Sequence, residues 1–198
     1  MLKWLFDVLF SVFGLIITIP VLTIVALVIK ISSPGPVFYR GERLGKGGKI
    51  FRIFKFRTMV PDAEKLGGPS TAGDDPRLLK IGHFLKRYQL DELPQLINVL
   101  KGEMSFVGPR PEVKIYVDMM TEEERKIIFS VKPGITDLAS LFNFHEGEVL
   151  RGSADPEKDY MERIRPTKIK LQLEYVKNRS FLLDLKIILR TILKIFIS

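Results

Sequence analysis

The sequence predicts an α/β (α+β) fold that is mainly helical, contains a small β-hairpin and attaches to a membrane. The attachment rests on the 22 residues from Val8 to Ile29, which carry no charge. As a helix they would reach about 33 Å, the thickness of a bilayer core. The hairpin is predicted from two β-type stretches on either side of the glycine-rich segment 45–48. Apolar residues at helical spacing predict the helices, most clearly from Leu93 to Leu100.

Composition limits the classes of protein that the chain can belong to. Its 198 residues are enough for one domain with a sizeable core. A hydrophobic content of 46% excludes a disordered chain, and the absence of cysteine excludes a disulfide scaffold, thiol catalysis and a cysteine metal site. Lys and Arg outnumber Asp and Glu by 31 to 23, which gives a net charge of +8. This charge predicts a phosphate-bearing partner: nucleic acid, anionic lipid or a nucleotide.

The apolar N-terminal segment has Pro20 near its middle. A helix is expected to bend there, because proline lacks an amide hydrogen and its ring crowds the preceding turn. A cleaved signal peptide fits poorly, since the apolar run is too long and no small-residue cleavage site follows it. Basic residues flank both ends, at Lys3 and Lys30, so charge does not orient a simple span. A straight transmembrane anchor and a helix that turns back to the same membrane face remain alternatives.

The hairpin is expected to pair a strand at Val37–Arg40 with a strand in Ile50–Met59. In the second strand Lys55 and Arg57 share a face, because strand side chains alternate. Seven basic residues lie between positions 40 and 57, against the single acid Glu42. This charge indicates either a strand edge protected from pairing or a cradle for phosphate.

Two short helices are predicted next. The first, within Leu78–Tyr88, ends in a basic turn that contains Lys86. The second has Asp91 as its N-cap, Pro94 in the tolerated first turn and Gly102 as its stop.

Asp91 and its neighbour Glu92 allow two interpretations. In the first, Asp91 caps the helix and Glu92 complements the helix dipole. In the second, the pair is chemical: adjacent carboxylates favour Mg²⁺, which binds carboxylates and substrate phosphates together. Asp91 would then be a nucleophile at phosphorus.

The segment after these helices presents Arg110 between two prolines. This stiff presentation suits either a bidentate contact with phosphate or a plain surface turn. Thr121 and Glu124 have the spacing of a helix capping box.

The C-terminal segment Phe181–Ser198 is rich in Leu, Ile and Phe, yet Lys186, Arg190 and Lys194 interrupt it every four residues. These charges form a basic stripe and argue against a span. An interfacial helix on anionic lipid and a buried amphipathic helix of the core both fit this pattern.

Taken together, six segments resemble the monotopic phosphoglycosyl transferases, a family of bacterial sugar transferases. Any one segment is weak, but their joint order is specific and covers most of the chain. The matching segments are Ser33–Tyr39 (SPGPVFY), Phe51–Met59 (FRIFKFRTM), Leu90–Gln95 (LDELPQ), Asn98–Pro111 (NVLKGEMSFVGPRP), Lys132–Thr136 (KPGIT) and Arg179–Lys186 (RSFLLDLK).

The resemblance implies a monotopic enzyme on the cytoplasmic face of the bacterial inner membrane. Its re-entrant membrane helix would cover residues 1–32 and would break at Pro20. Its catalytic domain would cover residues 33–198 and would include an interfacial helix at 181–198. Such enzymes move a sugar 1-phosphate from a UDP-sugar to polyprenol phosphate and release UMP, in the first membrane step of glycoconjugate synthesis such as that of O-antigen or exopolysaccharide.

The resemblance also implies residue roles. The catalytic pair falls on Asp91, the covalent nucleophile, and Glu92, which is linked to Mg²⁺ and proton handling, so both carboxylates are predicted metal ligands. The phosphate-binding residues fall on Lys55, Lys86 and Arg110. Membrane lipid is an expected partner and nucleic acid is not.

Two regions depart from the family pattern. Asp137 and Ser140 replace the family's glycine and glutamine, and Phe142–Pro166 does not match. Because residues near this stretch are candidates for contact with the sugar, the transferred sugar is not predicted. The alternatives to an enzyme are a non-catalytic membrane adaptor that binds anionic lipid and a membrane-tethered nucleic-acid binder.

Overall fold

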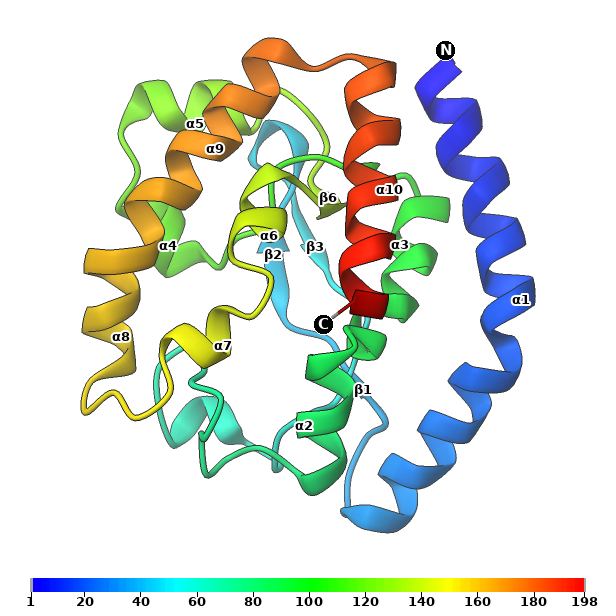
Figure 1. The fold of residues 1–198 in the computed structure, drawn as a ribbon, viewed down its shortest axis with the longest axis vertical. Helices are drawn as coiled ribbons and strands as arrows, with labels where there is room; N and C mark the ends of the chain where they lie inside the picture. Colours follow the sequence, from blue (N-terminus) through cyan, green and yellow to red (C-terminus); the bar gives the residue numbers. More distant parts are fainter. Residues whose placement is uncertain (1, 198) are drawn as a thin grey trace.

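In the computed structural model, which describes residues 2–197, the apolar N-terminal segment forms the long helix α1 (Leu2–Ser32) along one side of the chain (Figure 1). It is long and apolar enough to cross a bilayer, and only 11% of its most apolar 18-residue window is buried. The helix continues through Pro20, and its ribbon bends in its second half (Figure 1). The rest of the described chain is mostly short helices with three small sheets, which confirms a mainly helical fold.

The N-terminal third of α1 is fastened to the rest of the protein by polar contacts. The ammonium of Lys3 donates to the carbonyl of Val107 at 3.1 Å and forms an ion pair with Asp184. Asp7 is buried and accepts a hydrogen bond from the amide of Phe106 at 3.1 Å. A charged residue buried on a helix needs such partners, so this end of α1 belongs to the packed domain.

The other end of α1 is held by Arg57, which is buried. Its guanidinium donates to the carbonyls of Ser33 at 2.9 Å and Pro34 at 2.5 Å, just past the helix. Val25 and Ile29 pack beside this contact in one apolar cluster, with Phe56 and Leu85 of the domain. Both ends of α1 are therefore tied to the same domain.

The predicted hairpin is present, but each of its two strands is divided. Strand β1 (Phe38–Tyr39) pairs with β4 (Lys55–Phe56), and β2 (Glu42–Leu44) pairs with β3 (Ile50–Arg52), both antiparallel. The interruption has a physical cause, because the amide of Phe54 donates to the side chain of Asn98 at 2.8 Å instead of to a strand.

The helix that carries the two adjacent carboxylates differs from its prediction. Helix α2 (Lys80–Arg87) is followed by the 3₁₀ helix η3 (Leu90–Gln95) and then by α3 (Leu96–Leu100). The prediction that Asp91 is the N-cap is wrong: Asp91 lies inside η3, and Gln89 precedes η3 in a left-handed conformation with φ of 53°. This turn directs Asp91 and Glu92 into the protein, where both are buried.

The remaining elements surround this centre. The parallel pair β5 (Ser105–Val107) and β6 (Gly134–Thr136) forms the third sheet. Helix α5 (Glu122–Ile128) begins with the predicted capping box, since the side chain of Thr121 accepts a hydrogen bond from the amide of Glu124 and the reciprocal bond is present. The other elements are α4 (Lys114–Asp118), α5 (Glu122–Ile128), α6 (Leu138–Phe142), α7 (Glu146–Val149), α8 (Pro156–Asp159), the π-helix η4 (Tyr160–Ile164), α9 (Arg165–Asn178) and α10 (Phe181–Ile197).

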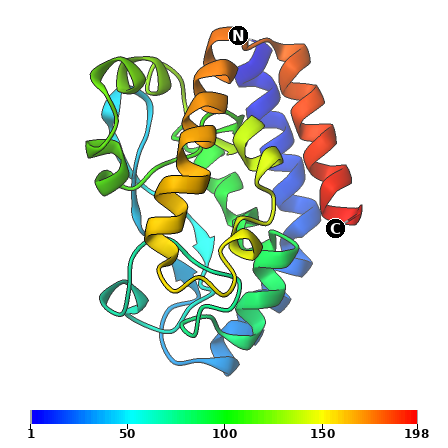
Figure 2. The ribbon, with the colours of Figure 1, turned by 60° about the vertical axis from the view of Figure 1, so that its left-hand side comes forward.

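Helix α10 begins beside the N-terminal end of α1 (Figure 2). The rings of Phe6 and Phe181 lie 5.4 Å apart, edge to face. The inner face of α10 buries Asp184 and Ile187, whereas its outer face leaves large apolar side chains exposed: Leu182, Leu189, Ile192, Leu193, Phe196 and Ile197. Packing on the core is thus confirmed for one face, and the other face presents an apolar surface together with the exposed side of α1.

Candidate active site

Glu92 is the centre of a buried charged cluster. Its carboxylate accepts hydrogen bonds from Lys55 Nζ at 2.8 Å, from Gln95 Nε2 at 3.0 Å, from Arg110 Nη1 at 3.2 Å and from Arg110 Nη2. An ionised carboxylate has about four acceptor positions, so these bonds occupy all of them. Burial alone would raise the pKa of Glu92, but the guanidinium of Arg110 and the ammonium of Lys55 outweigh burial and hold the pKa far below its usual range. Glu92 is therefore ionised and fully bonded.

Asp91 is also buried, but in a different environment. Among residues 2–197, no hydrogen bond to its carboxylate is found. Burial raises the pKa of Asp91, the positive charge of Lys55 opposes this rise, and the negative charge of Glu92 adds to it. Two adjacent carboxyl groups thus have pKa values pushed apart, as expected where one acid has a chemical role and the other positions charge. The acceptor oxygens of Asp91 remain available to a ligand.

All three predicted phosphate-binding residues lie near this pair, and they come from three separate parts of the chain. Lys55 is in β4, Lys86 is in the last turn of α2, and Arg110 follows β5. Lys55 and Arg110 contact Glu92, and Lys86 exerts its charge on Asp91 without a direct bond. Burial lowers the pKa of Lys55 and of Lys86.

The basic stretch 40–57 does not act as one cradle. Lys55 alone of its basic residues pairs with the carboxylates, whereas Arg57 holds the end of α1. Lys55 and Arg57 thus have different partners, although the amide of Arg57 donates to the carbonyl of Val37 at 2.9 Å and continues the pairing of β4 with β1. Lys46, Lys49 and Arg52 are exposed near the hairpin tip.

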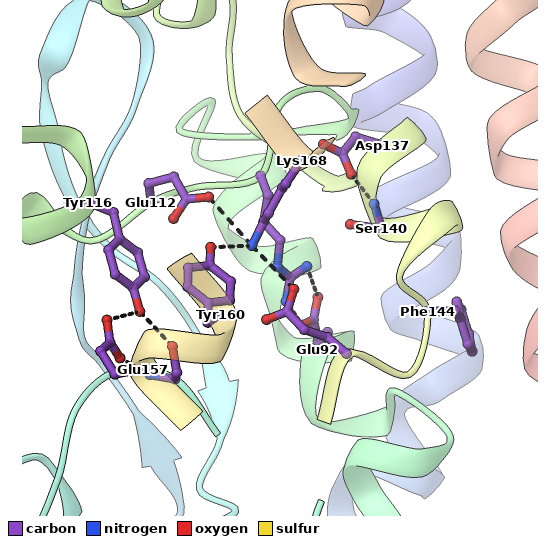
Figure 3. Close-up of polar contacts among 12 residues, drawn as sticks. Glu92, Glu112, Tyr116, Asp137, Ser140, Phe144, Glu157, Tyr160 and Lys168 are labelled. Atoms are coloured by element: carbon purple, nitrogen blue, oxygen red, sulfur yellow. Dashed lines mark hydrogen bonds and ion pairs between the residues drawn. The ribbon is translucent and has the colours of Figure 1, made fainter. Parts of the chain in front are cut away.

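Sequence reasoning missed a buried lysine next to this site. Lys168 of α9 donates to the hydroxyl of Tyr160 at 3.1 Å and lies 3.6 Å from Glu112 and 3.5 Å from Glu146 (Figure 3). Burial alone would lower its pKa, but these carboxylates reverse the effect and raise the pKa above its usual value. The sequence feature that could have identified this lysine is helical spacing. Lys168 lies four residues before Gln172, so the two side chains are on the same face of α9, and both are buried.

Residues of the divergent stretch 142–166 also lie next to the site. Glu146 extends from this stretch toward the buried cations. Burial alone would lower the pKa of Arg110, but the negative charge of Glu92, and to a smaller extent that of Glu146, raises it. Tyr116 donates to Glu157 at 2.8 Å and lies 2.8 Å from the hydroxyl of Ser70, which ties the loop before α2 to α8 (Figure 3).

Asp137, where the chain departs from the family pattern, caps α6. One of its oxygens accepts from the amide of Ser140 at 2.6 Å, and the other oxygen is buried with no hydrogen-bond partner among the described residues (Figure 3). Burial raises the pKa of Asp137, which faces the charges of Arg110 and Lys168.

The carboxylates suit Mg²⁺ only in combination with a phosphorylated substrate. Within residues 2–197, no three His, Cys, Asp or Glu side chains lie close enough together to hold a metal ion. Mg²⁺ commonly binds one or two carboxylates and completes its shell with substrate phosphates and water. The available oxygens of Asp91 fit this pattern, whereas those of Glu92 are occupied by Lys55, Gln95 and Arg110.

A buried acid pair close to three basic residues, in a protein with one long apolar helix, is the arrangement expected of a membrane-associated protein that binds phosphate groups. The family model for bacterial sugar transferases matches residues 1–198, so the chain belongs to that family. This confirms the family assignment that rested on the six sequence segments.

The names of curated relatives describe transfer of a sugar phosphate to undecaprenyl phosphate or production of exopolysaccharide. The chain is 38% identical to the UDP-glucose:undecaprenyl-phosphate glucose-1-phosphate transferase of Escherichia coli, over 100% of this chain and 41% of that protein. It is 36% identical to the UDP-N-acetylgalactosamine-undecaprenyl-phosphate N-acetylgalactosaminephosphotransferase of Aeromonas hydrophila, over 94% of this chain and 41% of that protein. It is 37% identical to the exopolysaccharide production protein PSS of Rhizobium leguminosarum bv. phaseoli, over 96% of this chain and 93% of that protein. The chain thus spans about two fifths of the first two relatives and nearly all of the third.

Proposed function

We propose that this protein transfers a sugar 1-phosphate from a UDP-sugar to polyprenol phosphate and releases UMP. One observation carries the proposal: Asp91 is a buried carboxylate with available oxygens, and it lies next to a carboxylate that holds two cations in place. The names of the relatives support both substrates. Relatives of similar identity differ in their sugar, so overall similarity does not identify the sugar that this chain transfers.

The proposed chemistry has two displacements at one phosphorus atom. A carboxylate oxygen of Asp91 attacks the phosphorus that bears the sugar, and the bond from that phosphorus to the bridging oxygen breaks, so UMP leaves with the electron pair. A phosphate oxygen of the polyprenol phosphate then attacks the same phosphorus and releases Asp91. Splitting one transfer into two steps is the usual benefit of a covalent nucleophile.

The cations prepare the site for a diphosphate. Lys55 and Arg110 are held by Glu92 and form charge-assisted hydrogen bonds, which the oxygens of a diphosphate also accept. When the donor binds, these cations exchange part of their contact with Glu92 for contact with the diphosphate. Mg²⁺, held by Asp91, Glu92 and the diphosphate, would offset further negative charge.

We also propose that α1 is re-entrant at Pro20 and that the domain lies on the cytoplasmic face of the membrane. Contacts at Lys3 and at Ser33 fasten both ends of α1 to one domain, which is unfavourable for a helix that crosses to the other side. The exposed apolar surface of α1 between them would enter one leaflet, and the outer face of α10 would lie in the interface.

Cysteine labelling tests this topology, because the native chain has no cysteine. Leu2→Cys and Ile31→Cys place thiols at exposed positions near the two ends of α1. Both are expected to resist an impermeant maleimide in intact cells and to react in inverted vesicles, as Lys46→Cys on the hairpin surface should. Reaction of position 2 in intact cells, with position 31 protected, would instead show a straight span.

The transfer itself is tested in vesicles that contain polyprenol phosphate. A panel of UDP-sugars that includes UDP-glucose and UDP-N-acetylgalactosamine should contain at least one from which the full-length protein releases UMP, and multiple turnover should require the polyprenol phosphate. Binding of anionic vesicles without UMP release from any donor would favour a membrane adaptor instead.

A further inference from the structure

A pocket of about 410 Å³ opens between the divergent stretch and the C-terminal end of α10. The pocket is wide open to solvent, so it is a hollow in the surface and not an enclosed cavity. The pocket is lined by the apolar side chains of Phe142, Phe144 and Val149 and by the polar side chains of His145, Glu148 and Lys194. Phosphate-binding residues 55, 86 and 110 are not part of its lining, so it is separate from the cation cluster around Glu92.

The pocket is nevertheless connected to the catalytic pair. The side-chain amide of Gln89, two residues before Asp91, donates to the carbonyl of Phe144 at 3.4 Å. Figure 3 shows Phe144 on the side of Glu92 that is nearer α10. Glu146, which follows the pocket residue His145, ion-pairs with the buried Lys168. One short segment therefore forms both a wall of the active site and a wall of this pocket.

The mouth of the pocket continues into the exposed apolar surface of α10. Phe142 is 65% exposed at the pocket, and Leu193 and Phe196 of α10, on either side of Lys194 in sequence, are 49% and 83% exposed. The apolar surface of α10 thus adjoins the pocket, and Lys194 is the residue of α10 that lines it.

The charge of the pocket favours an anion. The ammonium of Lys194 donates to the carbonyl of Leu141 at 2.6 Å and lies 5.5 Å from the centre of the Phe144 ring, which keeps it at the pocket. Among the described residues Lys194 has no ion pair, whereas Glu148 is neutralised by Arg151 at 2.7 Å. The pocket therefore combines a lysine that has no ion pair within residues 2–197 with aromatic and aliphatic walls.

We propose that this pocket binds the acceptor, an isoprenoid lipid phosphate, with its phosphate at Lys194 and its first isoprene units against Phe142, Phe144 and Val149. This inference rests on the proposed transferase function and adds the route of the second substrate. The pocket would hold the acceptor on the side of the site nearer α10, next to the segment at Phe144 that Gln89 contacts, before its phosphate moves on to the phosphosugar at Asp91.

The test is direct binding of farnesyl phosphate to the full-length protein in detergent, measured by calorimetry without any UDP-sugar. Lys194→Gln should raise the Kd by about tenfold or more, the scale of one lost charged contact. Val149→Asp should raise it by a similar factor, because it places a negative charge on the apolar wall. The matched control Lys186→Gln removes the same charge from an exposed position of α10 and should change the Kd by no more than about twofold. Farnesol has the isoprenoid chain without the phosphate, and inorganic phosphate has no chain, so each should bind far more weakly than farnesyl phosphate.

Equal losses for Lys194→Gln and Lys186→Gln would overturn the proposal, because they would show a diffuse basic surface. A Lys194→Gln variant that binds farnesyl phosphate normally would overturn it as well. These outcomes are distinct from failure of the proposed function, since binding is measured without transfer. If farnesyl phosphate binds in the pocket but no UDP-sugar yields UMP, the proposed transferase function would be contradicted, whereas the proposed isoprenyl phosphate site would be supported.

Discussion

With a UDP-sugar and Mg²⁺ but no polyprenol phosphate, the wild-type protein is expected to release up to one UMP per active site and then stop. The reason is that Asp91 keeps the phosphosugar until an acceptor removes it. Intact mass measurement should show an adduct of one phosphosugar, and peptide mapping should place it on Asp91. Addition of polyprenol phosphate should then remove the adduct and restart UMP release.

Two isosteric variants separate the adjacent carboxylates. Asp91→Asn should form no adduct and lose turnover, because an amide is a poor nucleophile at phosphorus. Glu92→Gln should also lose turnover, since it leaves Lys55 and Arg110 without their buried counter-charge, but it retains the nucleophile and is expected to accumulate some adduct. If no adduct forms and UMP appears only when both substrates are bound, transfer is direct and Asp91 has another role.

The nucleophile also predicts a pH dependence. Because burial raises the pKa of Asp91, its reactive carboxylate is lost on acidification at a higher pH than for an ordinary aspartate, whose pKa is about 4. kcat/KM should therefore rise with pH through the raised pKa of Asp91. Lys86→Gln should move this acid limb to higher pH, because the charge of Lys86 lowers the pKa of Asp91. Lys80→Gln, at an exposed position of the same helix, should leave the limb in place.

Removal of either cation from Glu92 is expected to reduce kcat/KM by about 10²-fold or more, the scale of one lost transition-state contact. Lys55→Ala and Arg110→Ala each remove a donor that the diphosphate would use. Lys46→Ala, on the exposed hairpin tip, should change kcat/KM by no more than about twofold, because exposed charges are screened. Equal small losses at all three positions would indicate a diffuse electrostatic field and contradict the assigned roles.

The same substitutions affect folding, and this effect has to be measured separately. Arg110→Ala leaves a buried carboxylate with fewer donors, and breaking a buried ion pair commonly costs about 3–5 kcal/mol. The melting temperature of Arg110→Ala should therefore fall. Arg110→Lys keeps the charge and loses the planar two-donor contact, so it should recover most of the stability while kcat/KM stays low. Recovery of kcat/KM together with the melting temperature would show that Arg110 has a structural role only.

Features of the fold that depend on nearby residues were predictable. The long apolar helix, the basic helix α2 and the capping box at Thr121 each follow from patterns within a few residues. The strand division and the 3₁₀ turn at Asp91 were not predicted. They depend on Asn98, which reaches Phe54 across 44 positions, and on the left-handed conformation of Gln89.

The sequence by itself determined which residue types are available for chemistry: two adjacent acids, Arg110 between prolines, and a chain that belongs to the bacterial sugar transferases. Only the tertiary structure decided how they are used. Lys55 and Arg110 lie 37 and 18 positions from Glu92, yet they occupy its oxygens and leave those of Asp91 available. Lys3 meets Asp184 across 181 positions and holds the membrane helix against the domain. Such contacts depend on how the elements pack, because burial removes water and makes each charge depend on the partner that packing brings to it.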